Sequence, residues 1–433
     1  MKTAAFYTLG CKVNQYETEA MTELFKNRGY EIVKFEDVSD VYVINTCTVT
    51  GMSDRKSRQI IRRAKKANPN AVIAVTGCYA QTAPEDILKI DGVNLIVGTN
   101  ERHNIVDLVE SADKETPSVK VGDIMHSHEF EELSITTYSE RTRAYIKIQE
   151  GCSQFCTYCI IPYARGPVRS REPEKIIAEI KNIVKNGFSE IILTGIHVAS
   201  YGVDLENMNL AKLLKIVNEI DGIERIRLSS IEPMTLNEDF ISAVAGCNKL
   251  CHHFHLSLQS GCNETLKRMN RKYTVEEYKK IVDGLRAVYP DVAITTDIMV
   301  GFPGETDEEF EKCAGFVREI DFSDAHIFQY SPRKGTPAAK RRDQIDPAVK
   351  EKRSKVIAEI TKKSRDKFLR SFIGKTYDVL FEQPMEGGFF EGKTDNYITV
   401  AVKTDENLSG KNLPVILEEV KDGVIYGKIE KDN

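Results

Sequence analysis

Strand-like and helix-like segments alternate along the first hundred residues, and this alternation limits the possible folds more than any other feature. The apolar runs TAAFYTL, DVYVINT and NAVIAVTG are separated by the helix-like stretches YETEAMTELFKNRG and SDRKSRQIIRRAKKAN. Strands that are apolar and β-branched on both faces are typical of a parallel sheet covered by helices. Residues 1–112 are therefore predicted to form a small parallel α/β domain.

A second alternation covers residues 138–370. Its strand candidates are AYIKIQE, EIILTGIHV, RIRLSSIEP, HFHLSLQSG, VAITTDIMVGF and DAHIFQYSP. The helix before the last strand opens with a capping box from Thr306 to Glu309, which marks a helix start. Six strand–helix repeats predict a partial (β/α)6 barrel, in which the chemistry collects at the carboxyl ends of the strands.

The C-terminal residues 371–433 show short strands with Gly-rich turns, namely KTYDVLFEQ, GGFFEGKT, NYITVAV, LPVILEEV and VIYGKIE. This pattern predicts a small antiparallel β-barrel. Residues 113–137 are polar and irregular, and we expect them to form a linker between the first two domains.

Charge is unevenly distributed along the 433 residues. The net charge is −5, yet residues 55–66 carry seven Lys/Arg and no acid, and residues 333–375 carry fifteen Lys/Arg against five acids. Such blocks either form solvated helix faces or hold a phosphate backbone.

The chain has no run of eighteen apolar residues and no signal-peptide pattern. We therefore expect a cytoplasmic protein without a membrane partner, in a compartment where thiols stay reduced. Its ten cysteines are then expected to be ligands or core residues rather than disulfides.

Cys152, Cys156 and Cys159 form a C-x3-C-x2-C motif directly after the first strand of the predicted barrel. Three thiolates at this spacing can bind three irons of a four-iron cluster and leave the fourth iron open. Structural zinc is the alternative, but zinc normally takes four protein ligands, often from paired C-x2-C motifs. The motif therefore favours an iron–sulfur cluster with a free coordination site.

This motif and the following IPYARGPVRSR resemble those of the radical S-adenosylmethionine (SAM) methylthiotransferases, and the similarity extends over essentially the whole chain. The resemblance implies a flavodoxin-like N-terminal domain, a radical-SAM partial barrel and a C-terminal TRAM domain, an OB-like RNA-binding barrel. It also implies a [4Fe–4S] cluster whose open iron binds SAM and whose electron cleaves it to a 5′-deoxyadenosyl radical.

Cys11, Cys47 and Cys78 each directly follow one of the three strands of the first region. Because the carboxyl ends of neighbouring parallel strands lie side by side, we expect these thiols to converge. The alternative is three separate core cysteines. A converged set would hold a second cluster, and the resemblance implies an auxiliary [4Fe–4S] cluster here that holds the sulfur for transfer.

The remaining cysteines give weaker signals. One group has the composition of a metal site but lacks a second well-spaced pair to complete a tetrahedron; its members are Cys247, Cys251, His252, His253 and His255. We favour structural roles for these residues, and core packing for Cys262 and Cys313.

The loops at the strand ends supply the expected SAM contacts, which are Gly195, Ser230, Glu232, Gln259, Ser260 and Gly301. Many members of the superfamily hold the methionyl amine with a Gly-Gly-Glu turn, whereas this chain reads LTGIH at that place. Ser230, Glu232 or the Gln259 turn would then share the contact with the amine.

The resemblance also implies a substrate. GCKVNQYETE and NTCTVT resemble the branch that acts on N6-threonylcarbamoyladenosine at position 37 of tRNA, where it adds a methylthio group at C2. The alternatives are isopentenyladenosine in tRNA, an aspartate of a ribosomal protein, or a non-catalytic iron–sulfur sensor that binds RNA. The candidate substrate contacts are Asn14, Glu17, Arg165, Arg169, Phe389 and Tyr397.

The expected partners are the anticodon stem-loop of a tRNA and a reductant such as flavodoxin or ferredoxin, and the sequence does not indicate the sulfur donor. Residues 376–433 hold twelve acids and six lysines. If the C-terminal barrel binds RNA, it must therefore use aromatic stacking more than charge.

Overall fold

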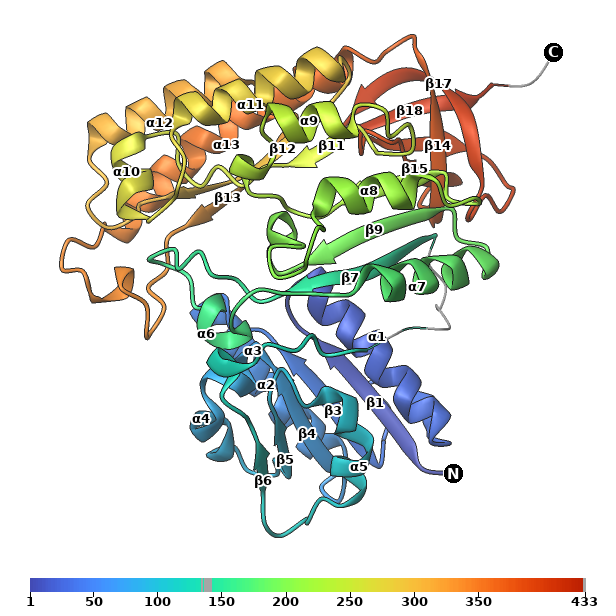
Figure 1. The fold of residues 1–433 in the computed structure, drawn as a ribbon, viewed down its shortest axis with the longest axis vertical. Helices are drawn as coiled ribbons and strands as arrows, with labels where there is room; N and C mark the ends of the chain where they lie inside the picture. Colours follow the sequence, from blue (N-terminus) through green and yellow to red (C-terminus); the bar gives the residue numbers. More distant parts are fainter. Residues whose placement is uncertain (134, 136–141, 431–433) are drawn as a thin grey trace.

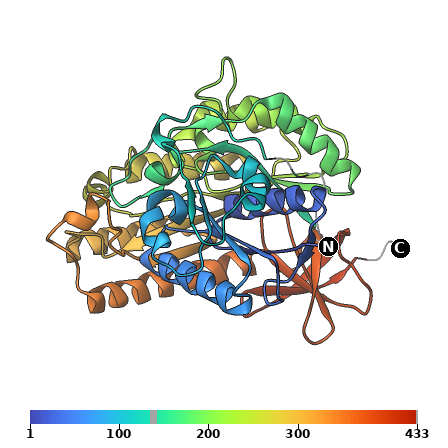
Figure 2. The same cartoon turned by 90° about the horizontal axis from the view of Figure 1, so that it is seen from below.

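The computed structural model describes residues 1–133, 135 and 142–430. Figure 1 shows an N-terminal domain at the bottom, a large helix-covered domain above it and a small barrel at the upper right. Figure 2 shows the same parts from below, with the C-terminal barrel to one side of the N-terminal domain. The expected boundary at residues 137 and 138 lies outside the described residues.

The N-terminal domain is a six-stranded sheet in which all strand pairs are parallel, with the order β2-β1-β3-β4-β5-β6. The strands are β1 (Thr3–Thr8), β2 (Glu31–Val33), β3 (Val41–Thr46), β4 (Val72–Gly77), β5 (Leu95–Val97) and β6 (Ser118–Lys120). The order of the first five strands is that of flavodoxin-like folds. The central strands β3 and β4 are buried along their whole length, which confirms the predicted parallel α/β domain.

Helices cover both faces of this sheet. They are α1 (Lys12–Asn27), α2 (Gly51–Ala67), α3 (Cys78–Thr82), α4 (Pro84–Leu88) and α5 (Ile105–Glu110), with short 3-10 turns η1 (Arg102–Asn104) and η2 (Ile124–His126). Met21 of α1 and Ile105 of α5 pack in one core cluster, and Ile61 of α2 and Tyr79 of α3 pack in another. The segment expected as a linker contributes β6, which pairs with β5 at the edge of the sheet.

The central domain contains the six parallel strands of the predicted partial barrel. They are β7 (Arg143–Glu150), β9 (Glu190–Gly195), β10 (Arg225–Leu228), β11 (His253–His255), β12 (Ala293–Val300) and β13 (Asp324–Gln329), and β8 (Arg169–Ser170) pairs antiparallel with β7. The strands fall into two sheets, β10-β9-β7-β8 and β11-β12-β13. Parallel bridges from Ile226 to Leu250 and from Ile231 to Leu256 connect the two sheets.

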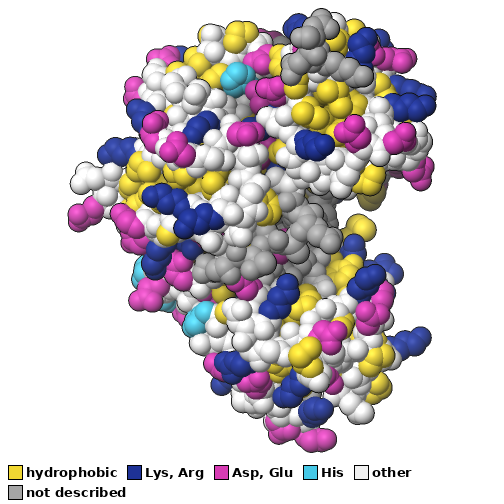
Figure 3. Space-filling view, turned by 90° about the vertical axis from the view of Figure 1, so that its right-hand side faces the viewer, with side chains coloured by type: hydrophobic (Ala, Val, Ile, Leu, Met, Phe, Trp, Pro, Cys, Tyr) yellow, Lys and Arg dark blue, Asp and Glu magenta, His cyan; other side chains and the backbone are white. Residues whose placement is uncertain are grey.

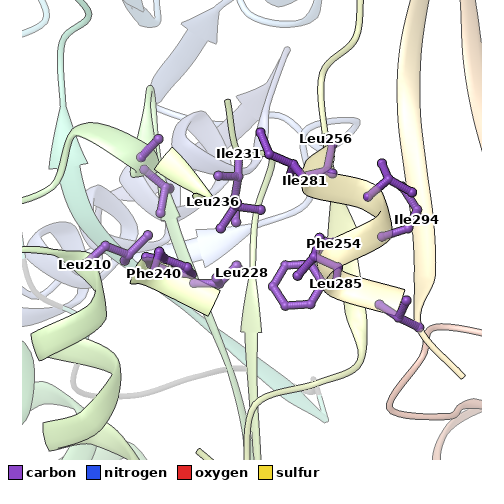
Figure 4. Close-up of a cluster of buried hydrophobic side chains, with 14 of the residues drawn as sticks. Leu210, Leu228, Ile231, Leu236, Phe240, Phe254, Leu256, Ile281, Leu285 and Ile294 are labelled. Atoms are coloured by element: carbon purple, nitrogen blue, oxygen red, sulfur yellow. The ribbon is translucent and has the colours of Figure 1, made fainter. Parts of the chain in front are cut away.

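The outer layer of this domain is helical. It consists of α7 (Pro173–Lys185), α8 (Leu210–Asn218), α9 (Glu238–Val244), α10 (Asn263–Arg268), α11 (Val275–Val288), α12 (Asp307–Ile320) and α13 (Pro347–Arg370), with the turns η3 (Val198–Ser200), η4 (Pro233–Thr235) and η5 (Ala338–Lys340). The short helix α6 (Ile161–Arg165) lies instead against α3 of the N-terminal domain (Figure 1). The capping box of Thr306 and Glu309 at the start of α12 is confirmed. Figure 4 shows how Phe254 and Ile294 from the strands meet Leu285 from α11 in the shared core.

The C-terminal strands close into a barrel with the order β14-β15-β16-β18-β17. They are β14 (Thr376–Met385), β15 (Phe389–Lys393), β16 (Thr399–Lys403), β17 (Asn412–Lys421) and β18 (Val424–Ile429). The predicted small barrel is confirmed, although one pair, β16 with β18, is parallel. Among the described residues, no helix is both long and apolar enough to span a membrane.

The C-terminal barrel contacts the amino ends of the central strands. Arg225 of β10 donates to the carbonyl oxygens of Asp378 and Lys393, and Arg227 donates to that of Asp395. The carboxyl ends of the central strands therefore remain available for the loops that carry the cysteines.

Candidate active site

Three thiols converge at the carboxyl edge of the N-terminal sheet. Cys11 and Cys47 come just after β1 and β3, and Cys78 begins α3 directly after β4. These three strands are neighbours in the sheet. Burial raises the pKa of Cys47, and the charge of Cys78 raises it further. Burial also raises the pKa of Cys78, and the charge of Cys11 adds to that increase. The structure thus brings together the three cysteines of what we call the N-terminal cysteine site.

Two glycines allow this close approach. Gly10 has a φ of +110°, and a Cβ at this position would lie 2.9 Å from the Cβ and 3.1 Å from the Sγ of Cys47. Gly77 has a φ of +93°, and a Cβ there would lie 2.4 Å from the carbonyl oxygen of Thr46. A side chain would be strained in either backbone conformation, so both glycines fix how closely the cysteines lie together.

A fully buried arginine from the central domain reaches this site. The Nε of Arg165 lies 3.2 Å from the Sγ of Cys78. Its Nη1 contacts one oxygen each of Glu17 and Glu150, at 2.5 and 2.6 Å. Its Nη2 contacts the Oδ1 of Asn14 at 2.6 Å and the second oxygen of Glu17 at 3.0 Å. All five N–H groups of the guanidinium therefore have an acceptor.

Arg165 is part of a larger buried ion network. Arg102 contacts Glu17 and Glu131 at 2.5 and 2.6 Å, and Lys147 contacts Glu150 at 2.7 Å. Burial alone would raise the pKa of Glu17, but the charges of Arg102, Arg165 and Lys147 hold it at about 2. Three cations thus balance three carboxylates beside the N-terminal cysteine site.

The network accounts for three of the candidate substrate contacts. Asn14, Glu17 and Arg165 are buried, and Arg165 donates to both of the other two. They therefore contact protein groups at the N-terminal cysteine site rather than an open surface. A fourth candidate, Arg169, is also buried, and its Nε and Nη2 have no hydrogen-bond partner among the described residues.

The second set of thiols lies in the loop between β7 and α6. Burial raises the pKa of Cys152 to about 11 and that of Cys159 to about 12, and the charge of Cys156 adds to both. The backbone N–H of Ile161 lies 3.4 Å from the Sγ of Cys159. Three neighbouring thiols with N–H donors directed at sulfur are a donor set that suits an iron–sulfur cluster. We call this set the barrel cysteine site.

A second arginine serves the barrel cysteine site. The Nη1 of Arg271 lies 3.4 Å from the Sγ of Cys156, and its Nη2 lies 3.4 Å from a carboxylate oxygen of Glu232. The other carboxylate oxygen of Glu232 lies 2.9 Å from the Nε2 of His197. Burial alone would raise the pKa of Glu232, but the hydrogen bond from His197 and the charge of Arg271 lower it below its ordinary value. An ionised carboxylate is therefore held beside the barrel cysteines.

Sequence reasoning did not single out Arg271 or His197 as site residues. His197 ends the LTGIH strand tail, so its position after β9 was the available signal. Arg271 lies in the loop between α10 and α11, 112 residues after Cys159 by number, and no spacing points to it.

The other expected SAM contacts also follow the carboxyl ends of strands. Gly195 ends β9, Ser230 is exposed after β10, and Ser260 is buried after β11. Gln259 has a φ of +65°, and its backbone pairs with β12 next to Met299. Gly301 lies against α13, since a Cβ there would lie 2.3 Å from the Cγ of Lys350. Of the six candidates, Glu232 has a contact that links it to a barrel cysteine, through Arg271.

The two aromatic candidates of the C-terminal barrel pack against other protein side chains. Tyr397 stacks on His253, with ring centroids 4.7 Å apart. Phe389 is half-buried and packs edge-on against Tyr426, with centroids 5.1 Å apart. Tyr397 is therefore engaged in the contact between two domains, whereas Phe389 belongs to the C-terminal barrel alone.

Protein-family models match three parts of the chain. Residues 146–317 match the radical SAM superfamily, residues 3–98 match the uncharacterized protein family UPF0004, and residues 370–429 match the TRAM domain. The three matches coincide with the central domain, the N-terminal sheet and the C-terminal barrel.

Curated relatives cover nearly the whole chain. The threonylcarbamoyladenosine tRNA methylthiotransferase MtaB of Bacillus subtilis is 45% identical over 421 residues, which are 96% of this chain and 93% of that protein. The protein of the same name from Aquifex aeolicus is 42% identical over 87% of this chain and 92% of its own length. The tRNA-2-methylthio-N(6)-dimethylallyladenosine synthase of Clostridium botulinum is 41% identical over 87% of this chain and 85% of its own length.

Among solved structures, the radical S-adenosylmethionine methyltransferase TsrM from Kitasatospora setae matches with a TM-score of 0.59. It is 16% identical, and the match covers 78% of this chain and 75% of that one. At this identity the match shows a shared fold.

Proposed function

The chain belongs to the radical SAM tRNA methylthiotransferases, and on that premise we propose that its substrate is N6-threonylcarbamoyladenosine at position 37 of tRNA, which it converts to the 2-methylthio form. Support comes from relatives that carry this activity in their names, two of which are 45% and 42% identical. The relative named for dimethylallyladenosine, at 41% identity, supports the second candidate substrate.

The observation that carries the methylthiolation itself, for either candidate substrate, is the presence of two three-thiol sites joined by one helix. The barrel cysteine site lies within residues 146–317, the part of the chain that matches the radical SAM superfamily. The N-terminal cysteine site offers a second set of the same kind, and we propose that it holds the auxiliary [4Fe–4S] cluster. When bound, the barrel cluster supplies the electron that cleaves SAM, and the auxiliary cluster supplies a place for the sulfur that is transferred.

The chain's own residues bind and orient these groups. We propose that Glu232 accepts a hydrogen bond from the amino group of SAM, because it is a buried, ionised carboxylate linked through Arg271 to Cys156. Charge-assisted contacts of this kind are about twice as strong as neutral ones. Little acid–base catalysis is required of the protein, since the cofactors carry the chemistry.

The basic face of α2 supports the binding of an RNA backbone. Arg55, Lys56, Arg62 and Lys66 are exposed there and have no ion-pair or hydrogen-bond partner among the described residues. The helix begins four residues after Cys47. In contrast, the C-terminal barrel is acidic. Figure 3 shows acidic and basic side chains of the described residues mixed over the side of the molecule that it draws, without a continuous basic patch. The electrostatic contribution to RNA binding is therefore assigned to α2 rather than to the C-terminal barrel.

The proposal is tested by mass spectrometry of tRNA nucleosides from cells that lack the gene and carry either the parent chain or a variant. We expect the parent chain to restore 2-methylthio-N6-threonylcarbamoyladenosine, and Cys47→Ala and Cys156→Ala to abolish it. Cys247→Ala is the matched control, because Cys247 packs in the core away from both cysteine sites.

Other outcomes would select a different substrate. Restoration of a 2-methylthio-isopentenyladenosine instead would overturn the threonylcarbamoyl substrate in favour of the second candidate. Unchanged tRNA nucleosides with a modified ribosomal protein would move the substrate to a protein side chain. Reduced enzyme that releases no 5′-deoxyadenosine from SAM would support a non-catalytic iron–sulfur sensor.

A further inference from the structure

One short helix contacts both cysteine sites. The first residue of α6, Ile161, directs its backbone N–H at the Sγ of Cys159, and the last residue, Arg165, directs its Nε at the Sγ of Cys78. Five helical residues rise only about 6 Å between the first and the last. The carbonyl oxygen of Ala164 in the same helix accepts from Thr99 of the N-terminal domain at 2.9 Å. Helix α6 therefore fixes one site relative to the other.

Arg165 also reaches the other two N-terminal cysteines through Asn14. The Oδ1 of Asn14 accepts from Arg165 at 2.6 Å. Its Nδ2 donates to the carbonyl oxygens of Leu9 and Thr46, at 2.7 and 3.1 Å. Leu9 lies two residues before Cys11, and Thr46 lies directly before Cys47. Displacement of the guanidinium would therefore disturb the backbone that carries all three thiols.

We propose that Arg165 is a positioning residue that fixes the three thiols of the N-terminal cysteine site and raises the reduction potential of the cluster held there. The proposal rests on the proposed auxiliary cluster and adds to it the residue that tunes it. It also assigns Asn14 and Glu17 to the support of this site instead of to contacts with the substrate.

The direction of the effect follows from charge. A reduced cluster carries one more negative charge than an oxidised one, so a nearby cation and an N–H donor to a ligand sulfur stabilise the reduced form. Arg165 supplies both to Cys78 in a fully buried position. Lysine at this position would keep the charge but offer three donors in place of five.

The two arginines allow a matched experiment on the full-length chain. A form with alanine at Cys152, Cys156 and Cys159 keeps only the N-terminal cysteine site. A form with alanine at Cys11, Cys47 and Cys78 keeps only the barrel cysteine site. Each form is reconstituted with iron and sulfide without oxygen, and its midpoint potential is measured by redox titration with electron paramagnetic resonance. Arg165→Lys is expected to lower the midpoint of the N-terminal cluster and leave that of the barrel cluster unchanged.

Arg271→Lys is the matched control, since Arg271 donates to Cys156 of the barrel site. It should lower the midpoint of the barrel cluster only. Arg165→Gln removes the charge as well and should lower the N-terminal midpoint further than Arg165→Lys. An unchanged N-terminal midpoint in Arg165→Lys, or an equal shift of both clusters, would overturn the proposal.

A second variant separates tuning from damage to the fold. Glu150→Gln keeps the side-chain shape but removes a negative charge that lies 2.6 Å from Arg165. It should raise the midpoint potential of the N-terminal cluster. General damage to the fold would instead shift this midpoint in the same direction in Arg165→Lys and in Glu150→Gln. If the Arg165→Lys variant takes up no iron, the sign of the midpoint shift in Glu150→Gln decides whether the charges around Arg165 tune the cluster. Failure of the auxiliary cluster itself would look different, because the parent form with only the N-terminal site would then bind no iron.

Discussion

The ring of Tyr397 stacks on the imidazole of His253, with ring centroids 4.7 Å apart and planes 13° apart. The guanidinium of Arg227 lies over the same ring at 4.8 Å. Tyr397 comes from the C-terminal barrel, and the other two come from strands of the central domain. The contact therefore holds two domains together, in a place where sequence reasoning expected an aromatic side chain ready to stack on RNA.

Tyr397→Leu should lower the free energy of unfolding by about 1–3 kcal/mol, because it removes an aromatic stack and three cation–π contacts, with Arg143, Arg227 and Lys393. Its affinity for tRNA should change little. Urea unfolding and filter binding measure the two effects, and Phe389→Leu is the control outside this interface. A roughly tenfold loss of tRNA affinity without a loss of stability would instead show that the ring stacks on a base.

Charge removal on α2 should weaken tRNA binding. Arg62→Gln combined with Lys66→Gln is expected to reduce the slope of log affinity against log salt by about 1 for each phosphate that is no longer neutralised. Lys181→Gln with Lys185→Gln is the matched control, since these exposed lysines lie on α7, outside both basic blocks. Equal decreases in the two double variants would mean that overall charge, rather than the face of α2, determines affinity.

Gly10→Ala should prevent the N-terminal site from binding its cluster. The new Cβ would lie 2.9 Å from the Cβ of Cys47 at a backbone φ of +110°. Gly29→Ala is the control, because Gly29 has a φ of +87° but no atom within 4 Å of a new Cβ. Both variants place a side chain at a positive φ, so comparison of their iron content after reconstitution tests the clash with Cys47. Full iron content in Gly10→Ala would show that the thiols tolerate a wider spacing.

Glu232→Gln should weaken SAM binding. Removal of a charge-assisted hydrogen bond costs about 1.5–3 kcal/mol, which corresponds to a roughly 10- to 150-fold rise in the KM for SAM. Release of 5′-deoxyadenosine from the dithionite-reduced enzyme measures it. Glu238→Gln is a control on the surface, where Glu238 pairs with Lys280. A normal KM in Glu232→Gln would assign the amine contact to another strand-end residue.

The interface of the C-terminal barrel should weaken as the pH rises through neutrality. The hydrogen bond to Asp291, 2.7 Å away, raises the pKa of His252 above its ordinary value of 6.5, and Asp395 adds to the effect. Folding therefore favours protonated His252, so its stabilisation is full below that ordinary value and is lost as the pH rises through the raised pKa.

The stability difference between the parent chain and His252→Gln should accordingly be larger at pH 6 than at pH 8 in urea unfolding. His103 also has a raised pKa, from its hydrogen bond to Glu131, but it is present in both proteins and cancels in the difference. A pH-independent difference would show that His252 acts through packing against Tyr289, whose ring centroid lies 4.7 Å from that of the imidazole.

Much of the fold could be predicted because its signals are local. Buried strands β3 and β4 are visible as unbroken apolar runs, and α12 is marked by the capping box of Thr306 and Glu309, which are close in sequence. Residues 113–137 were harder to interpret, because β6 is a three-residue edge strand with little apolar character. Short edge strands are specified by their neighbours more than by their own sequence.

The sequence by itself determined the two sets of three cysteines, since one is a compact motif and each member of the other follows a recognisable strand. Only the tertiary structure decided what surrounds them. The contact between Arg165 and Cys78 joins residues 87 positions apart, and that between Arg271 and Cys156 joins residues 115 positions apart. Buried ion pairs and hydrogen bonds depend on distance in space and on desolvation. Neither the distances nor the desolvation can be inferred from the order of residue types, because both are set only when the domains pack together.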